Sequence, residues 1–77
     1  MKAVSECLKR FFNKERKLKS KWTAISAEDG RLLFYHYQHL ILVYNIKEHK
    51  ENYRWHETRT DLRGVNAALK WLQENEK

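Results

Sequence analysis

The strongest constraint on the fold is an Asp-Gly pair, Asp29-Gly30, that separates two runs of strand-forming residues. Glycine accepts a positive φ angle without steric cost, so Asp-Gly between such runs is a strong signal for a β-hairpin. The run before the pair contains Trp22 and β-branched residues, and the run after it is aliphatic and aromatic. The sequence therefore predicts a hairpin that joins strands over about 21–26 and 31–37.

Strand-forming residues continue to position 46, and sixteen residues are too many for one ordinary strand. We expect a break near 37–39, which gives strands over 31–37 and 40–46. The polar segment 47–52 predicts a loop. The alternating pattern that follows it predicts a further strand over 53–58.

Apolar residues at helical spacing predict one helix before these strands and one after them. A first helix is expected over 3–19, with basic side chains opposite an apolar stripe. The stripe consists of Val4, Leu8, Phe11 and Leu18, with Cys7 and Phe12 at its edges. Glu15 interrupts the stripe, so the helix is expected to fray or end near it. A second helix is expected over 60–75, capped by Thr58 or Thr60.

The expected order is helix, three or four antiparallel strands, helix (α-β-β-β(-β)-α). This is an α+β fold of two layers, in which the helices cover one face of the sheet. The 77 residues are enough for one small domain, 1–77. A chain of this size buries only about 60% of its unfolded surface. Its core is therefore small, and a partner or a second copy would add stability.

Composition excludes several classes of protein. With 42% hydrophobic and 13% aromatic residues, the chain is too apolar for a disordered protein. The longest apolar run, 40–44, is far shorter than the roughly 20 residues of a membrane helix. No secretory signal is expected at the N-terminus. The single cysteine, Cys7, cannot form an intramolecular disulfide, so we expect a reducing, cytoplasmic location.

The net charge of +6 is carried entirely by residues 1–21, because 22–77 contain equal numbers of basic and acidic groups. One interpretation is a nucleic-acid-binding surface that contacts phosphates. Its residues would be Lys9, Arg10, Lys14, Arg16, Lys17, Lys19 and Lys21. The simpler interpretation is a solvated helix face. A membrane partner is not expected, because this helix lacks tryptophan.

Aromatic residues point to a protein interface. Residues 31–37 and 40–46 are apolar on both faces of their strands, and a two-layer domain covers only one face. The apolar and aromatic side chains left on the uncovered face favour a homodimer interface or another protein partner over stacking of single-stranded bases. Alternatively, other parts of the chain wrap both faces. The candidate interface residues are Tyr35, Tyr37, Tyr44, Trp55, Gly64, Ala68 and Trp71. The last three, with Ala67, could equally pack against the first helix of the same chain.

Catalysis and metal binding are not expected. The histidines (His36, His39, His49 and His56) show no spacing typical of a zinc site. A small ribonuclease would need residues that act as general acid and base. The residues whose side chains could take part are His36, Tyr44, Arg54, His56 and Glu57. Nothing in the sequence joins them into one site. We therefore expect no cofactor, no small-molecule substrate and no catalytic residues.

The order of elements resembles that of double-stranded-RNA-binding domains. Those domains contact phosphates through a lysine-rich start of their last helix. Here that start, 60–64, contains one Asp and one Arg, and the basic charge lies at the other end of the chain. The resemblance therefore covers the order of elements alone. We expect a non-catalytic protein-binding module that forms homodimers or docks on another protein, with DNA or RNA binding as the alternative.

Overall fold

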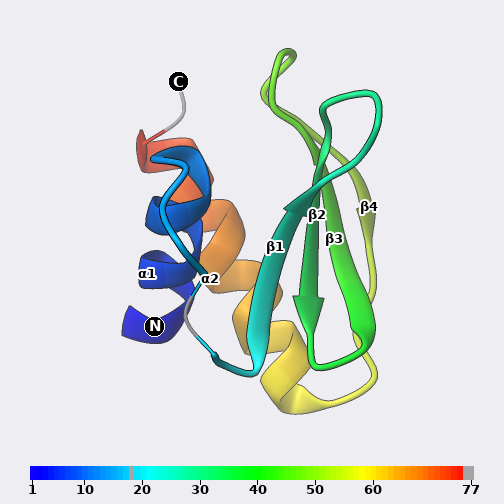
Figure 1. Cartoon of the computed structure of the whole chain (residues 1–77). Helices are drawn as coiled ribbons and strands as arrows, with labels where there is room; N and C mark the ends of the chain where they lie inside the picture. Colours follow the sequence, from blue (N-terminus) through cyan, green and yellow to red (C-terminus); the bar gives the residue numbers. More distant parts are fainter. Residues whose placement is uncertain (18, 76–77) are drawn as a thin grey trace.

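The four strands form one antiparallel sheet in the order β1-β2-β3-β4. The structure is a computed structural model that describes residues 1–17 and 19–75. Its elements are α1 (Lys2–Phe12), β1 (Trp22–Ser26), β2 (Leu32–His36), β3 (His39–Asn45), β4 (Lys50–Arg54) and α2 (Arg59–Asn75). The expected α+β order of helix, strands and helix is confirmed, with four strands (Figure 1).

The Asp29-Gly30 hairpin is present and joins β1 to β2. Gly30 has a φ angle of +87°, which explains the need for glycine here. The backbone N–H of Arg31 donates to the Asp29 carboxylate over 3.2 Å, and Gly30 N–H donates to Ala27 O over 2.9 Å. Beyond the turn, the strands pair from Ser26 with Leu32 to Trp22 with His36.

The other two hairpins differ from the expected boundaries by a few residues. The chain turns between β2 and β3 at Tyr37-Gln38, where Tyr37 has a φ of +55° and His36 pairs with His39. The last strand spans Lys50–Arg54, three residues earlier than expected. It is an edge strand with mostly exposed side chains, so polar residues are tolerated there and backbone pairing with β3 sets its position.

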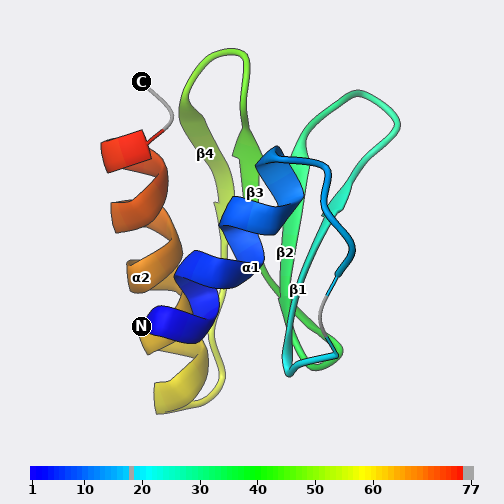
Figure 2. The same cartoon turned by 60° about the vertical axis from the view of Figure 1, so that its left-hand side comes forward.

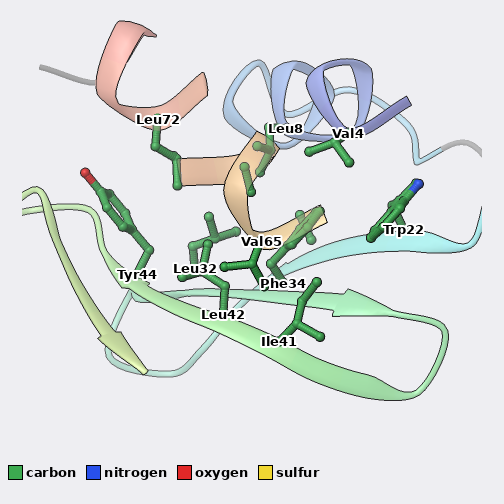
Figure 3. Packing of buried hydrophobic residues seen from close by; sticks show 12 residues of the cluster. Val4, Leu8, Trp22, Leu32, Phe34, Ile41, Leu42, Tyr44, Val65 and Leu72 are labelled. Atoms are coloured by element: carbon green, nitrogen blue, oxygen red, sulfur yellow. The ribbon is translucent and has the colours of Figure 1, made fainter. Parts of the chain in front are cut away.

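Both helices lie on the same face of the sheet, as two views of the chain show (Figures 1 and 2). The core fills the space between these layers (Figure 3). Its sheet residues are Trp22, Ala24, Leu32, Phe34, Ile41, Leu42 and Tyr44, and its helix residues are Val4, Leu8, Val65, Ala68 and Leu72. Val4 and Leu8 belong to the apolar stripe expected for the first helix.

The first helix ends at Phe12, short of the full range 3–19 and three residues before Glu15, near which it was expected to fray or end. Lys14 adopts a left-handed conformation with a φ of +57°. Its backbone N–H donates to Phe11 O, and Glu15 N–H donates to Arg10 O over 2.9 Å. These two bonds form a Schellman motif, which closes a helix C-terminus. Leu18, expected on the helix stripe, lies outside the described residues.

The termination of α1 leaves a basic connection, residues 13–21, between α1 and β1. Of the seven basic residues expected on the helix or just after it, only Lys9 and Arg10 are helical. The remaining five lie on the connection, and all five are exposed: Lys14, Arg16, Lys17, Lys19 and Lys21. Over residues 1–17 and 19–75, neither helix has the length and apolar character needed to cross a membrane.

Candidate binding face and histidine–aspartate cluster

The sheet face turned away from the helices carries a continuous set of uncharged side chains. Successive residues of a strand point to opposite faces, and directly paired residues share a face. The strand registers therefore place seven uncharged side chains on what we call the open face: Thr23, Ile25, Leu33, Tyr35, Leu40, Val43 and Tyr53. At one end of the same side of the sheet, Asn45 pairs with Lys50, which is the one charged residue on this side within the paired strands. No helix of the described chain lies over it (Figures 1 and 2).

The open face is organised in two cross-strand rows. One row runs across all four strands from Ile25 through Leu33 and Val43 to Tyr53, and the other joins Thr23, Tyr35 and Leu40. Val43, at the centre, is only 8% exposed because its neighbours cover it, whereas Tyr53 at the edge is 44% exposed. The face is thus a packed apolar surface with one aromatic ring free at its rim.

The expected interface residues fall into three places. Tyr35 lies on the open face, and Tyr37 and Trp55 are exposed at the end of the sheet, at 68% and 39%. Tyr44, Gly64 and Ala68 are buried in this chain's own core, so their assignment to an interface is wrong. Tyr44 shares a face with its strand partner Leu32, which points toward the helices, and the sequence does not indicate which face the helices cover.

The small residues of α2 serve packing within the chain. Gly64 allows the Trp22 ring to lie against the helix backbone. The ring of Trp71 stacks on Phe12 of α1, with 5.7 Å between the centroids. The contact of Trp71 with Phe12 agrees with the alternative given above, in which this face of the last helix packs against the first helix of the same chain. It leaves Trp71 only partly exposed.

The basic residues of the nucleic-acid hypothesis do not form one helix face. Arg10 is held within the chain, because its Nε lies 2.9 Å from Glu6 Oε1 and its Nη1 donates to Arg16 O. Lys9 and the five cations of the basic connection stay exposed. Beside the connection is a hollow of about 330 Å³ between α1 and β1, whose lining includes Cys7, Phe11 and Trp22.

A buried carboxylate joins the start of α2 to the turn between β2 and β3. Asp61 is completely buried. His36 Nδ1 lies 2.6 Å from Asp61 Oδ1, and His39 Nδ1 lies 3.2 Å from Asp61 Oδ2. An ionised carboxylate only accepts hydrogen bonds, so both ring nitrogens donate. We call these three residues the histidine–aspartate cluster.

The same carboxylate closes the N-terminus of α2. Asp61 Oδ2 accepts from the backbone N–H groups of Glu57 and Thr58, each at 3.0 Å, while Asp61 N–H donates to Thr58 Oγ1. This reciprocal pattern is a capping box with Asp in place of the usual Glu, and Thr58 is the cap. Asp61 Oδ1 has only the two histidines as partners, whereas Oδ2 joins the helix cap to His39.

The electrostatics of Asp61 follow from these contacts. Burial by itself would raise the pKa of the Asp61 carboxyl. Hydrogen bonds from two imidazoles and two backbone N–H groups outweigh burial, and the pKa lies well below its usual value. The carboxyl group therefore stays ionised at neutral pH although water does not reach it.

The two histidines of the cluster differ in their surroundings. His36 is buried and stacks on Trp22, with 4.4 Å between the ring centroids, and no described residue partners its Nε2. His39 is about one-third exposed. Its Nε2 lies 3.6 Å from a Glu57 carboxylate oxygen, and Trp55 contacts its ring edge to face. Only His39 is accessible from solvent.

The residues considered for ribonuclease chemistry do not assemble into one site. Tyr44 is in the core and His36 is in the buried cluster. Arg54 is engaged by Glu51, whose carboxylate lies 2.6 Å away. Cys7, the free thiol, packs at the edge of the core, and burial raises the pKa of the thiol, which disfavours the reactive thiolate.

The histidine–aspartate cluster was missed by the sequence analysis. His36 and His39 flank the β2–β3 turn as a cross-strand pair, but Asp61 follows 22 residues after His39, and no local pattern links them. The one available signal was the Thr58–Asp61 spacing of a capping box, which places Asp61 at a helix start. A comparison with known proteins finds no family model, curated protein or solved structure that matches this chain.

Proposed function

We propose that this domain is a non-catalytic binding module that associates with a second copy of itself through the open face. The observation that carries the proposal is the layer arrangement. Two helices cover one face of the sheet and leave seven uncharged side chains on the other. Burial of such a surface against an identical one stabilises both copies in proportion to the apolar area removed from water.

At the β4 edge of the sheet, face-to-face packing is favoured over pairing with a further strand. The exposed edge strand β4 carries Lys50, Glu51 and Arg54, and the last two form an ion pair. Charged residues on an edge strand oppose extension of the sheet by another strand. Two sheets packed face to face, about 10 Å apart, leave Glu51 and Arg54 outside the contact, because their strand partners Tyr44 and Leu42 point toward the helices.

The distribution of charge supports a second copy rather than a nucleic acid on this face. The seven residues of the open face are uncharged, and Lys50 lies beyond them at the end of this side of the sheet. The apolar parts of two such faces therefore meet without like-charge repulsion. A nucleic acid that stacked its bases on Tyr35 and Tyr53 would also need cations for its phosphates. The charge excess instead lies in α1 and the basic connection.

Sedimentation equilibrium on the purified chain tests the proposal. At micromolar concentration we expect twice the monomer mass for the native protein. Leu33→Lys on the open face should give the monomer mass. Asn66→Lys, which adds the same charge at an exposed position of α2, should keep the dimer. A native protein that sediments as a monomer, or equal dimerisation of both variants, would refute the proposal.

A second candidate function, binding of DNA or RNA, is favoured by the five exposed cations of the basic connection. Such binding would weaken with salt by about 0.9 log unit per log unit for each phosphate contacted on duplex DNA. The triple variant Lys14→Glu, Lys17→Glu and Lys19→Glu should abolish it. If the native chain fails to bind DNA or RNA at low salt, this function is excluded. A cytoplasmic location, proposed from the single cysteine, suits both functions.

A further inference from the structure

We propose that the histidine–aspartate cluster binds one zinc ion, with His36 Nδ1, His39 Nδ1 and Asp61 Oδ1 as ligands and water in the fourth position. These three side chains offer ligand atoms that all lie within 4.8 Å of one another. Two imidazoles and one carboxylate form a ligand set that zinc accepts. The site is independent of the open face.

The distances from Asp61 Oδ1 to the two imidazoles lie near the value that a zinc site requires. Ligands about 2.0–2.1 Å from a tetrahedral zinc ion lie about 3.3 Å from one another. The separation of His39 Nδ1 from Asp61 Oδ1 is 3.4 Å, close to that value. His36 Nδ1 lies 2.6 Å from the same oxygen as a hydrogen-bond donor. It would move outward by roughly 0.7 Å as the ion takes the place of the ring proton.

The Asp61 carboxylate is already held in an orientation that allows Oδ1 to bind a zinc ion. Asp61 Oδ2 is fixed by the backbone N–H groups of Glu57 and Thr58. The ion would take up Oδ1 and leave the capping box intact. Hydrogen bonds of this kind, which hold a ligand in place from outside the coordination sphere, are a regular part of metal sites.

The surroundings of His39 also suit a histidine that binds a metal ion. With zinc on Nδ1, the neutral ring carries its one proton on Nε2, which faces the Glu57 carboxylate at 3.6 Å. A carboxylate that accepts from a ligating histidine is a recurrent arrangement. Because His39 is partly exposed, it also gives the ion and a coordinated water a path from solvent.

His36 limits the affinity of the site. Zinc on its Nδ1 places the ring proton on Nε2, which is buried and has no partner among the described residues. Loss of such an outer contact costs about 10–100-fold in metal affinity. We therefore expect weaker binding than that of a structural site with four protein ligands.

Isothermal titration of the full chain with zinc chloride at pH 7.5 tests the inference. The native protein should bind one zinc ion and gain thermal stability, and magnesium, which prefers oxygen ligands, should do neither. His39→Gln should weaken zinc binding by about tenfold or more. His56→Gln, the matched change at an exposed histidine outside the cluster, should bind as the native chain does. Absence of binding to the native chain, or equal effects of the two substitutions, would overturn the inference.

Ring-nitrogen NMR of the native chain provides a readout that needs no variant. On addition of zinc, the Nδ1 resonances of two histidines should shift, and those of the other two should stay unchanged. Cobalt(II), used as a spectroscopic substitute, should give the visible bands of a four-coordinate ion without the thiolate charge-transfer band that ligation by Cys7 would produce. Shifts spread evenly over all four histidines would mean nonspecific binding and overturn the site.

Discussion

The six-membered ring of Trp22 lies against the backbone of Gly64, in the space that a side chain at this position would occupy. A glycine inside a helix costs about 1 kcal/mol relative to alanine. Here the cost is offset by the close approach of β1 to α2. The indole also stacks on Phe34 and His36, so it cannot easily move aside.

Gly64→Ala should therefore destabilise the protein in spite of the better helix propensity of alanine. We expect overpacking to cost about 3 kcal/mol and the helix to gain about 1, a net loss of about 2 kcal/mol in the free energy of unfolding. Urea denaturation measures it. Asn66→Ala, at an exposed position of the same helix, should gain a few tenths of a kcal/mol.

A double-mutant cycle locates the cause of this loss. In a Trp22→Leu background the ring that meets the new methyl group is absent. Gly64→Ala should then be neutral or stabilising. If alanine costs the same in both backgrounds, contact with Trp22 is not the reason for glycine at this position.

Lys14→Gly should stabilise the protein by about 1 kcal/mol, because the left-handed conformation of Lys14 is strained for any residue with a Cβ and free for glycine. Thermal or urea unfolding measures the gain. Lys9→Gly removes the same charge from the helical part of α1 and should cost about 1 kcal/mol instead. Equal signs for the two substitutions would contradict the Schellman motif.

Acid should remove the stabilisation provided by Asp61. Its pKa in the folded protein lies below the unfolded value of about 3.9, so folding favours the ionised form. This contribution is complete above about pH 5 and is lost progressively as the pH falls below 4. Urea midpoints measured from pH 7 to 2 with a chelator present should drop steeply for the native chain.

Asp61→Asn should flatten that acid dependence and lower stability at pH 7, because the amide group cannot accept from both imidazoles and the helix cap. Asp29→Asn is the matched control in the exposed hairpin turn and should keep the native slope below pH 4. An unchanged acid slope in Asp61→Asn would show that other carboxyl groups dominate the acid transition.

The stacked pair of Phe12 and Trp71 should couple the two helices. Its rings lie 5.7 Å apart at an interplanar angle of 23°. In a double-mutant cycle with Phe12→Ala and Trp71→Ala, we expect a coupling energy of about 0.5–1.5 kcal/mol. A coupling near zero would mean that each ring packs on other neighbours.

The order of elements could be predicted because each element follows from local patterns. The Asp29-Gly30 turn and the apolar spacing of the last helix are both visible in short windows of sequence. Glu15 indicated an early end of α1, but the exact position could not be predicted, because Lys14 takes a conformation that usually requires glycine. Tertiary packing and the two capping bonds decide that position.

In the candidate sites, too, local sequence patterns predicted some features, and tertiary packing decided the others. Alternation within strands predicted that some apolar side chains would remain uncovered, and the open face contains Tyr35 as expected. Which face is covered depends on where the helices pack, so alternation alone could not show that Tyr44 lies in the core. Asp61 and the two histidines come together only in the tertiary structure, across 22 and 25 residues of chain.

The sequential strand order also bears on how the chain folds. Each strand pairs with the next one along the chain, across connections of two to five residues, so closing each hairpin costs little loop entropy. The contact between α1 and α2 instead joins the two ends of the chain. We expect the hairpins to form first and the helices to dock last. Amide hydrogens should accordingly exchange slowest in β2 and β3 and fastest in α1.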